Sequence, residues 1–446
     1  MIKPTRKLGS RFAIIMLAFV AICTTSVDAQ QPLNVDIING VKTATPITVV
    51  PFALQGGSPP STDIADVIHN DFNRSGKFRV LGKGSIVESP SQGSDIKFAT
   101  WRLLKQDFIV VGRIKDAGNS MLQVEYELWD VNKQQSLLSQ AMPPAPAGDL
   151  RNVAHQIADA IYQKITGVRG AFWTRIAYIT AVGLGSNTTY SLVVADSDGF
   201  NPQVVAGPTK ESLLSPSWSP DGKKIAYVSF ESGNSNIYVQ DLTTGSRQLV
   251  ESHTKGINGA PAWSPEGRKL AVALSFSGNL NIYVLDMASR HETRITSDNL
   301  SINTQPVWAP DGQSIYFTSD RSSKPQIYQI PASGGTATRI SFQGQSNQNV
   351  AVSYDGKQIA MVQGNGNVYR IAIMDQTLGG QVRFVSPGPY DESPSFAPNA
   401  SMLLYAATEG ARGVLYSVSD DGNVRQRLVL SDGDVRETSW GPYREH

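Results

Sequence analysis

The feature that most constrains the fold is a seven-residue segment in the second half of the chain. It reads Pro-Ser-Trp-Ser-Pro-Asp-Gly at residues 216–222 and then recurs. The first three copies are 45 residues apart, and weaker copies continue at a step of 44 residues. A period of this length indicates a repeat architecture in which each copy forms one supersecondary unit. The copies are marked by Trp218, Trp263, Trp308, Val352, Phe396 and Trp440.

Each repeat divides into four short runs that are rich in β-branched and aromatic residues. In the first complete copy, the Trp segment is followed by an Asp-Gly pair and then by runs at 224–229, 236–240 and 247–250. Glycine accepts positive φ without steric cost, so Asp-Gly predicts a tight hairpin turn. Four strands in a repeat of this length predict one blade of a β-propeller. We expect the tryptophans to pack between blades.

The two ends of the repeat region complete each other. The runs at 175–180 and 192–195 match the second and third strands of a blade, but no Trp strand precedes them. Residues 437–441 contain a Trp strand, and no further strand follows it. The last strand should therefore complete the first blade, which leaves few exposed sheet edges. We predict an all-β, six-bladed β-propeller over residues 173–446 that is closed by the C-terminal strand.

The preceding part of the chain, residues 30–168, lacks this repeat. Strands are predicted at 46–52, 78–81, 108–112 and 123–130. Helices are predicted after the capping residue Asp63, over 95–105 and over 150–165. Strands that alternate with helices over this length predict a small α/β domain. Residues 168–172 are the expected linker to the propeller.

The first 29 residues have the pattern of a secretory signal peptide. Four basic residues precede an apolar run at 12–23, and small residues follow, so we expect cleavage after Ala29 and export to the periplasm. Cys23 is the only cysteine, so a cleaved chain has no disulfide, and an exported chain without disulfides favours a bacterial periplasm. The alternative is an uncleaved membrane anchor, for which the run is short. No other apolar run is long enough to span a bilayer.

Composition and motifs argue against several classes of function. The formal net charge is +1, which gives no electrostatic reason to bind nucleic acid. The sequence contains no Gly-x-Ser-x-Gly elbow, no His-Glu-x-x-His motif and no phosphate-binding loop. Of the five histidines, only His253 falls near the loops described next. We therefore expect no catalytic residue, no metal site and no cofactor.

The longer loops of the repeats indicate a binding site. In a four-stranded meander, the loops before each Trp strand and those between the second and third strands share one face. These loops are rich in amides and hydroxyls and should converge on a central funnel that can hold a peptide or a protein loop. Solvated loops without a partner are the alternative. The loops before the Trp strands include 256–261, 301–306, 346–349, 390–394 and 434–438.

In the order of its parts, the chain resembles the TolB family, the periplasmic propeller proteins of the Tol–Pal system. The strand at 46–52 is similar to the family's early strand, and the funnel loops around Asn258, Asn303, Asn347 and Asp391 are similar too. The resemblance covers essentially the whole mature chain. The Trp-Ser-Pro-Asp-Gly motif alone is less specific, because propellers of some peptidases and lyases share it.

The resemblance implies a non-enzymatic adaptor that is expected to be a monomer. Its propeller mouth is expected to bind the peptidoglycan-associated lipoprotein Pal, and the system supports outer-membrane integrity and invagination during cell division. The chain departs from the family at Ile257, where other members carry a histidine, so one polar contact to Pal is in doubt. The expected binding residues are Ile257, Asn258, Ala260, Asn303, Thr304, Gln305, Asn347, Asn349, Asp391, Glu392, Ser393 and Glu437.

The resemblance also implies that the stretch from Gln30 to Val41 engages the inner-membrane protein TolA. Its apolar residues Leu33, Val35, Ile37 and Ile38 are the expected contacts. An alternative interpretation makes this stretch the first strand of the α/β domain. For the whole chain, the alternative function is a propeller enzyme, such as an oligosaccharide lyase or a peptidase, with a site in the funnel.

Overall fold

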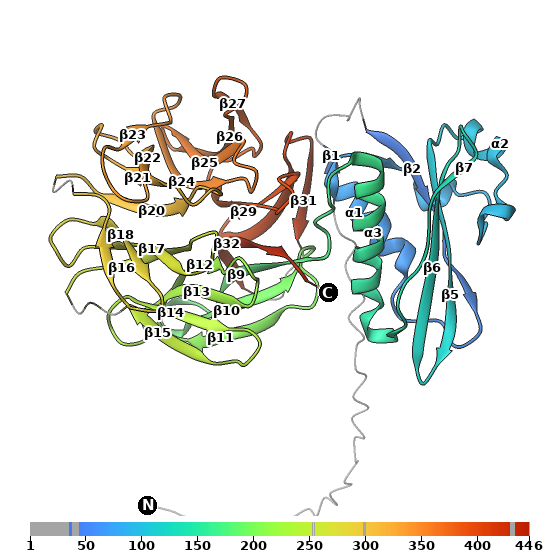
Figure 1. Ribbon diagram of the computed structural model, residues 1–446, viewed down its shortest axis with the longest axis horizontal. Coiled ribbons are helices and arrows are strands. Elements are labelled where there is room, and N and C mark those ends of the chain that lie inside the picture. The colour runs from blue at the N-terminus through green and yellow to red at the C-terminus, as the bar shows by residue number, and fades with distance from the viewer. Residues whose placement is uncertain are drawn as a thin grey trace, which may run out of the picture. The chain divides into compact units, whose positions relative to one another are not determined.

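The structure is a computed structural model (Figure 1). It describes residues 35–37, 44–251, 253, 255–297, 300–428 and 433–445. The predicted signal peptide at 1–29 lies outside these residues, as do Leu33 and Ile38 of the predicted TolA-binding stretch. Among the described residues, no helix combines the length and apolar character needed to cross a membrane.

The α/β domain predicted for the first part of the chain is confirmed, and it is built on a mixed sheet. The strand order is β4-β2-β5-β6-β7; β2 is parallel to β4 and β5, and the later strands are antiparallel. Two short strands extend the sheet, β3 beside β5 and β8 beside β6. The strands are β2 (Thr45–Val49), β3 (Ala53–Gln55), β4 (Phe78–Val80), β5 (Phe108–Gly118), β6 (Met121–Asp130), β7 (Gln135–Ala141) and β8 (Ala145–Pro146).

Helix α1 (Ile64–Ser75) begins and ends where its sequence predicts. The carboxylate of Asp63 accepts the N–H of Asp66 at 3.2 Å, which satisfies one of the free donors of the first turn. Gly76 ends the helix in the left-handed region with φ 70°. Buried side chains recur at spacings of three and four residues and face the sheet; they include Ile64, Val67, Ile68 and Phe72.

The sheet has an apolar layer on each face. Helices α1 and α3 (Leu150–Thr166) cover one face of the sheet. There they pack against the strand residues Ile47, Val110 and Leu128. On the other face, fully buried Trp101 of α2 (Phe98–Leu103) packs with Ile109, Val111 and their neighbours. Helix α2 is shorter than the predicted 95–105. Residues 93–95 form a separate 3₁₀ turn, and Lys105 adopts a left-handed conformation with φ 55°.

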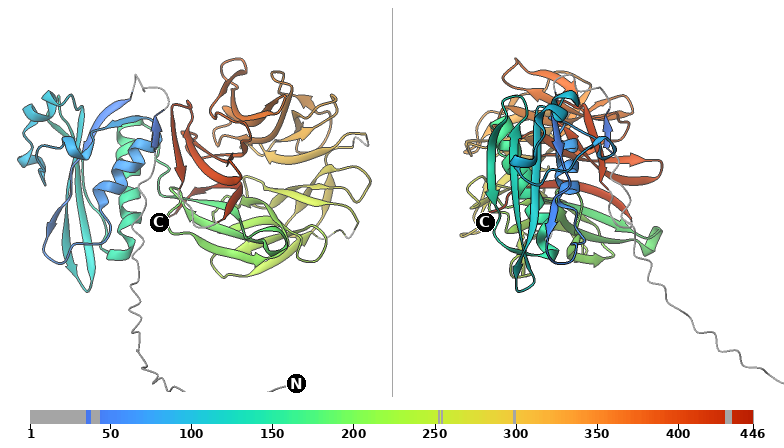
Figure 2. Two further views of the ribbon diagram at one scale, coloured as in Figure 1. Left: turned by 180° about the vertical axis from the view of Figure 1, so that it is seen from behind. Right: turned by 90° about the vertical axis from the view of Figure 1, so that its right-hand side faces the viewer.

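The predicted six-bladed propeller is also confirmed (Figures 1 and 2). Five blades run in chain order from the inner to the outer strand, and the strand that carries the marker residue is always the inner one. These strands are β12 (Leu213–Trp218), β13 (Lys224–Ser229), β14 (Asn236–Asp241), β15 (Arg247–Glu251), β16 (Asn258–Trp263), β17 (Lys269–Leu274), β18 (Asn281–Asp286), β19 (Glu292–Arg294), β20 (Asn303–Trp308), β21 (Ser314–Ser319), β22 (Gln326–Pro331), β23 (Thr338–Arg339), β24 (Ser346–Val352), β25 (Gln358–Asn365), β26 (Val368–Asp375), β27 (Gln381–Phe384), β28 (Glu392–Phe396), β29 (Met402–Glu409), β30 (Arg412–Ser419) and β31 (Val424–Leu428).

The remaining blade joins the two ends of the propeller. Its strands are β32 (Asp434–Tyr443), β9 (Thr174–Val182), β10 (Thr189–Asp196) and β11 (Gln203–Thr209), from the inside outward. Strand β32 pairs antiparallel with β9, with Trp440 opposite Ile176. The C-terminal strand therefore closes the ring, as the repeat count predicts.

A serine supports the Asp-Gly turn of the first copy, whereas the third copy has Ala309 at this position. In the first copy, the N–H of Gly222 donates to the carbonyl of Ser219 at 2.9 Å, and Gly222 has φ 67°. The Ser219 hydroxyl donates to Asp221 at 2.5 Å and accepts the N–H of Lys224 at 2.9 Å. The turn thus satisfies its own polar groups, which fixes the register of the hairpin.

The N-terminal strand β1 (Val35–Ile37) joins the propeller. It pairs antiparallel with β31, the outer strand of the blade β28–β31, with Val35 opposite Gln426 and Ile37 opposite Val424. The alternative interpretation, a first strand in the α/β sheet, is therefore wrong. The strand adds a fifth member to a propeller blade.

The predicted linker at 168–172 is exposed at Val168 and Arg169 and is packed from Gly170 onward. Ala171 and Phe172 are almost completely buried. The carboxylate of Asp159 on α3 accepts the N–H of Phe172 at 2.7 Å and that of Trp173 at 3.2 Å. A Cβ on Gly170 would lie 2.5 Å from the Cα of Asp159, so only glycine fits there.

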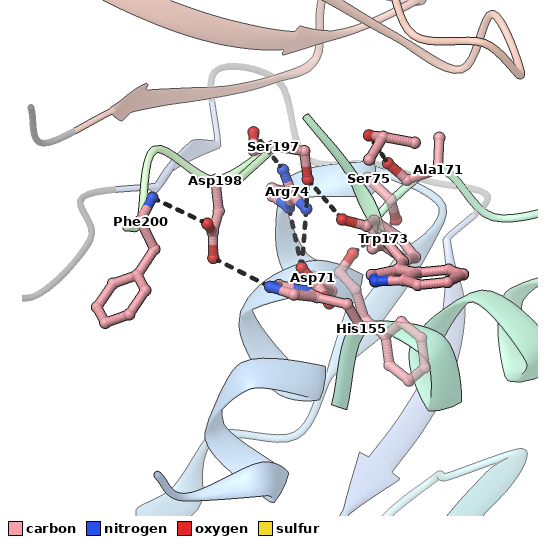
Figure 3. Close-up of polar contacts among 12 residues, drawn as sticks. Asp71, Arg74, Ser75, His155, Ala171, Trp173, Ser197, Asp198 and Phe200 are labelled. Carbon is pink, nitrogen blue, oxygen red and sulfur yellow. Dashed lines mark hydrogen bonds and ion pairs between the residues drawn. The ribbon is translucent and has the colours of Figure 1, made fainter. Parts of the chain in front are cut away.

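A buried polar cluster joins helices α1 and α3 to the turn after β10 (Figure 3). We call it the Asp71 cluster; its members are Asp71, Arg74, His155, Ser197 and Asp198. Arg74 donates to Asp71 at 2.9 Å, to the carbonyl of Ser197 at 2.9 Å and to its hydroxyl at 2.8 Å. His155 Nδ1 lies 2.7 Å from Asp71, and its Nε2 lies 3.6 Å from Asp198. The charged side chains of the cluster are thus buried next to side chains of opposite charge.

Candidate functional site

The inner strands of the propeller surround a central channel. The cavity has a volume of about 690 Å³ and is lined by residues from all six inner strands. Prolines and aromatic residues of the marker segments line much of it, together with polar residues that lie earlier on the same strands. The lining begins near the middle of each inner strand and runs to the prolines beside the Asp-Gly turns, so it includes only the last residues of the predicted mouth loops. The cavity is large enough to admit several side chains.

One residue on each inner strand, three positions before the marker residue, adopts a left-handed conformation. At each of these positions the pairing with the second strand shifts register, as in a β-bulge. A left-handed conformation costs a non-glycine residue about 1–2 kcal/mol, so the blades share a common strain at this level. We call these residues the bulge ring; they are Ser215 (φ 52°), Ala260 (φ 48°), Gln305 (φ 52°), Asn349 (φ 54°), Ser393 (φ 54°) and Glu437 (φ 51°).

Hydrogen bonds connect the bulge ring from blade to blade. Gln305 Oε1 accepts the backbone N–H of Asn349 and the hydroxyl of Thr318, both at 2.9 Å. On the other side of the ring, Glu437 Oε2 accepts the N–H of Ser215 at 3.1 Å. Five of the predicted binding residues belong to this ring and line the channel: Ala260, Gln305, Asn349, Ser393 and Glu437.

Two glutamates at the mouth, Glu437 and Glu392, have raised pKa values. Burial raises the pKa of Glu437, the N–H of Ser215 lowers it in part, and the carboxylate of Glu392 raises it further. Partial desolvation also raises the pKa of Glu392, although this residue is largely exposed, and Arg436 offsets part of the effect. The two carboxylates thus hold their protons more tightly than exposed glutamates do.

Three of the residues predicted to contact a partner at the mouth are buried in the structure. The side chains of Asn258, Asn303 and Asn347 are fully buried, so they do not face a partner. Each amide nitrogen donates to the polypeptide of the preceding blade: Asn258 to Ser235 O at 2.7 Å, Asn303 to Asn281 Oδ1 at 3.2 Å, and Asn347 to Gln326 Oε1 at 2.9 Å. These asparagines hold the loops of the mouth in position.

Asp391 occupies the equivalent position on its blade. Its side chain is 3 % exposed and accepts the N–H of Gly388 at 2.7 Å. Burial raises the pKa of Asp391, and the hydroxyl of Ser386 and the N–H of Gly388 offset part of this effect. Its neighbour Glu392 is exposed, and Thr304 is partly exposed at the corresponding position of its own blade.

Three of the side chains that are exposed just before the inner strands are apolar. Ile257, Ile302 and Tyr390 are 55 %, 50 % and 54 % exposed. All three stand six positions before the marker residue of their blades, immediately before the buried asparagine or aspartate. We call them the apolar rim. Sequence reasoning singled out Ile257 but missed Ile302 and Tyr390, although their shared repeat position could have identified them.

A second cavity opens beside the rim. It has a volume of about 360 Å³ and lies among the blades β24–β27, β28–β31 and the closing strand β32. Tyr369 and Tyr390 provide aromatic surface, while Glu392, Asp434 and Arg436 provide charge. Such a lining suits a polar or cationic side chain that inserts from a partner.

Comparisons with known proteins cover both parts of the chain. The family model of the TolB beta propeller domain matches residues 162–444, and that of the TolB amino-terminal domain matches residues 33–137. The Tol-Pal system protein TolB of Xanthomonas campestris pv. campestris (strain B100) is 64 % identical over 417 residues, which cover 93 % of this chain and 94 % of the relative.

Two further comparisons agree over nearly the full length. The Tol-Pal system protein TolB of Xanthomonas euvesicatoria pv. vesicatoria (strain 85-10) is 62 % identical over 444 residues, or 99 % of both chains. The crystal structure of TolB from Acinetobacter baumannii matches with a TM-score of 0.82 and 38 % identity, over 92 % of this chain and 100 % of that chain. The chain therefore belongs to the TolB family of Tol-Pal system proteins, which are not enzymes.

Proposed function

We propose that this chain is the periplasmic adaptor of a Tol–Pal system. Its propeller mouth binds the peptidoglycan-associated lipoprotein Pal, and residues 30–41 bind TolA. It acts through protein contacts, without catalysis or a cofactor, and supports outer-membrane integrity and invagination during cell division. Family membership and the sequence pattern of an exported chain support this proposal.

The apolar rim is the observation that carries the Pal site. Ile257, Ile302 and Tyr390 expose about half of their surface at one repeat position, where the chain enters the inner strands. Burial of apolar surface contributes about 25 cal/mol per Å², and a few such side chains usually dominate the affinity of an interface. A protein loop that enters the channel can cover the rim and leave the polar groups of the bulge ring hydrogen-bonded.

The buried asparagines support the same interpretation by making the mouth rigid. Asn303 bonds to Asn281 and Ser301 and accepts a hydrogen bond from Arg321 at 2.8 Å. Because these bonds exist before a partner arrives, little conformational entropy is lost when the partner binds. The predicted asparagines therefore serve binding by positioning Thr304 and the apolar rim.

The TolA site is proposed for the stretch that includes β1. Three residues of β1 pair with β31, and β1 is the outermost strand of its sheet. A short pairing of this kind contributes little stability by itself. The stretch can therefore leave the blade and present its apolar residues to TolA. Deleting residues 30–41 should abolish TolA capture and leave Pal capture intact; retained TolA capture would refute this assignment.

Thr304→Arg tests the Pal site. Arginine at this partly exposed position should obstruct the mouth, so capture of purified Pal should fall at least tenfold while the circular dichroism spectrum is unchanged. Thr243→Arg is the matched control, because Thr243 is exposed on the β14–β15 turn, away from the loops before the Trp strands. Equal Pal affinity in both variants would show that the mouth is not the site.

A further inference from the structure

Two adjacent blades bring a histidine and two glutamates together. Glu251 is the last residue of β15, and His253 lies two positions later in the chain. Glu292 is the first residue of β19 on the next blade. His253 Nε2 lies 3.1 Å from both carboxylate oxygens of Glu292 and 3.5 Å from Oε1 of Glu251. One imidazole nitrogen thus faces two carboxylates that come from different blades.

The electrostatics of this group favour a cation. The side chain of Glu251 is 8 % exposed, that of Glu292 is 24 % exposed and that of His253 is 31 % exposed. With a neutral imidazole, the three side chains carry two negative charges in a partly buried place, where like charges repel strongly. Arg290 lies nearby, and its guanidinium donates to the carbonyl of Val250 at 3.3 Å. Both carboxylates would attract a divalent ion.

The geometry matches a tetrahedral metal site. The possible ligand atoms of the three residues all lie within 4.8 Å of one another. Bonds of about 2.0–2.2 Å from zinc to nitrogen or oxygen place tetrahedral ligand atoms about 3.4 Å apart. The measured separations of 3.1 and 3.5 Å lie close to this value, and a water molecule can supply the fourth ligand.

The imidazole is held in its orientation from outside the cluster. The ring of Phe276 stacks on His253 with centroids 3.8 Å apart. The backbone carbonyl of His253 accepts a hydrogen bond from Asn258 Nδ2 at 2.8 Å. The stacking restricts rotation of the imidazole, and the hydrogen bond holds the backbone that carries it.

We propose that Glu251, His253 and Glu292 form a binding site for a divalent transition-metal ion of the zinc class. An imidazole ligand and only three protein ligands favour such an ion over calcium or magnesium, which take more oxygen ligands. The ion links the outer strands of two blades and fixes the connection that leads to Ile257 and Asn258. None of the three ligands is itself a proposed Pal or TolA contact, so zinc binding can be tested without either partner.

Zinc titration of the tag-free mature chain, first stripped with a chelator, tests this site. Calorimetry should detect one zinc ion per chain, and excess calcium should not compete. His253→Ala and Glu292→Gln should each weaken zinc binding at least tenfold. His291→Ala is the matched control, because His291 is exposed beside Glu292 and outside the cluster, and this variant should bind zinc like the wild type.

Thermal unfolding provides a second readout, because an ion that binds only the folded chain raises the melting temperature. Zinc should raise it for the wild type and His291→Ala, and not for His253→Ala or Glu292→Gln. Circular dichroism should show that all four proteins are folded. Equal zinc affinity in the wild type and His253→Ala, or displacement of zinc by calcium, would overturn the proposal.

Discussion

The indole N–H of Trp440 donates to the hydroxyl of Thr174 at 2.9 Å, although 266 positions separate the two residues. Thr174 in turn donates to the carbonyl of Ala171 at 2.7 Å, and Trp440 is 2 % exposed. Residues from the two ends of the propeller thus share one buried hydrogen-bond chain. Closure of the ring therefore depends on side chains as well as on the pairing of β32 with β9.

Thr174→Val should weaken this closure. Valine has nearly the same shape, but it leaves the indole N–H of Trp440 and the carbonyl of Ala171 without their partner. Each buried group left unsatisfied costs about 1–3 kcal/mol, so the loss of both bonds should lower the free energy of unfolding by about 2–6 kcal/mol. Urea denaturation followed by tryptophan fluorescence measures it. The exposed residue Thr243 gives the control Thr243→Val; an equal midpoint for both variants would contradict the prediction.

Deletion of residues 434–446 should open the ring. The deletion removes the whole of β32, exposes the edge of β9 and loses the burial of Trp440, which alone is worth about 3–5 kcal/mol. We expect a melting temperature at least 10 °C lower, since about 1 kcal/mol shifts a large domain by 2–4 °C. Differential scanning calorimetry is the measurement, with deletion of 445–446 as control. A truncated chain as heat-stable as the full one would refute closure of the ring by β32.

Asn303→Ala should act on stability, in contrast to Thr304→Arg at the next position. The substitution removes the hydrogen bonds of Asn303 with Asn281, the carbonyl of Ser301 and Arg321, which should cost roughly 2–3 kcal/mol. Chemical denaturation measures this cost, and Asn234→Ala, at an exposed loop position, is the control. Unchanged stability of Asn303→Ala would mean that the asparagine does not hold the mouth.

The bulge ring allows a test in which two similar changes have opposite effects. Ala260 has φ 48°, so Ala260→Gly should relieve strain and raise the free energy of unfolding by about 1 kcal/mol. Ala262 lies two residues further along the same strand and pairs regularly with Ala271. Ala262→Gly should therefore lower the free energy of unfolding by about 1 kcal/mol. Shifts of the same sign in urea titrations would show that the ring is not strained.

The repeat made most of the fold predictable from the sequence. The regular spacing of the marker residues predicts blades of the same architecture. Because no further strand follows Trp440, the sequence also predicts which blade closes the ring. Asp63 and Gly76 predict the ends of α1, because caps depend on local backbone chemistry. The pairing of β1 with β31 was not predictable, since three residues carry too little pattern to specify a partner strand.

The site was only partly predictable, because burial is a property of the assembled blades. Asn258, Asn303 and Asn347 stand at strand starts, where a polar residue fits a binding loop as well as a buried hydrogen bond. Only the structure shows that they bond to the preceding blade. Similarly, Glu251 and Glu292 lie on different blades, so no spacing motif connects them to His253.

The Asp71 cluster should make stability depend on pH. Burial by itself lowers the pKa of His155, but the carboxylate of Asp71 and, beyond it, that of Asp198 outweigh this effect, so the pKa is raised above 6.5. Burial raises the pKa of Asp198, whereas His155, Arg151 and Arg74 lower it, so that its pKa is far below the usual value. The folded chain therefore binds the proton of His155 more tightly than the unfolded chain does.

His155→Gln tests this linkage. The contribution of His155 is fully present below pH 6.5 and is lost as the pH rises through the raised pKa. The wild type should thus exceed His155→Gln in unfolding free energy most at pH 6, and this difference should narrow toward pH 9 in urea titrations. His69→Gln is the control of opposite sign, because burial lowers the pKa of His69 and its contribution improves as the pH rises. A difference between wild type and His155→Gln that is constant with pH would show that His155 is not charged in the cluster.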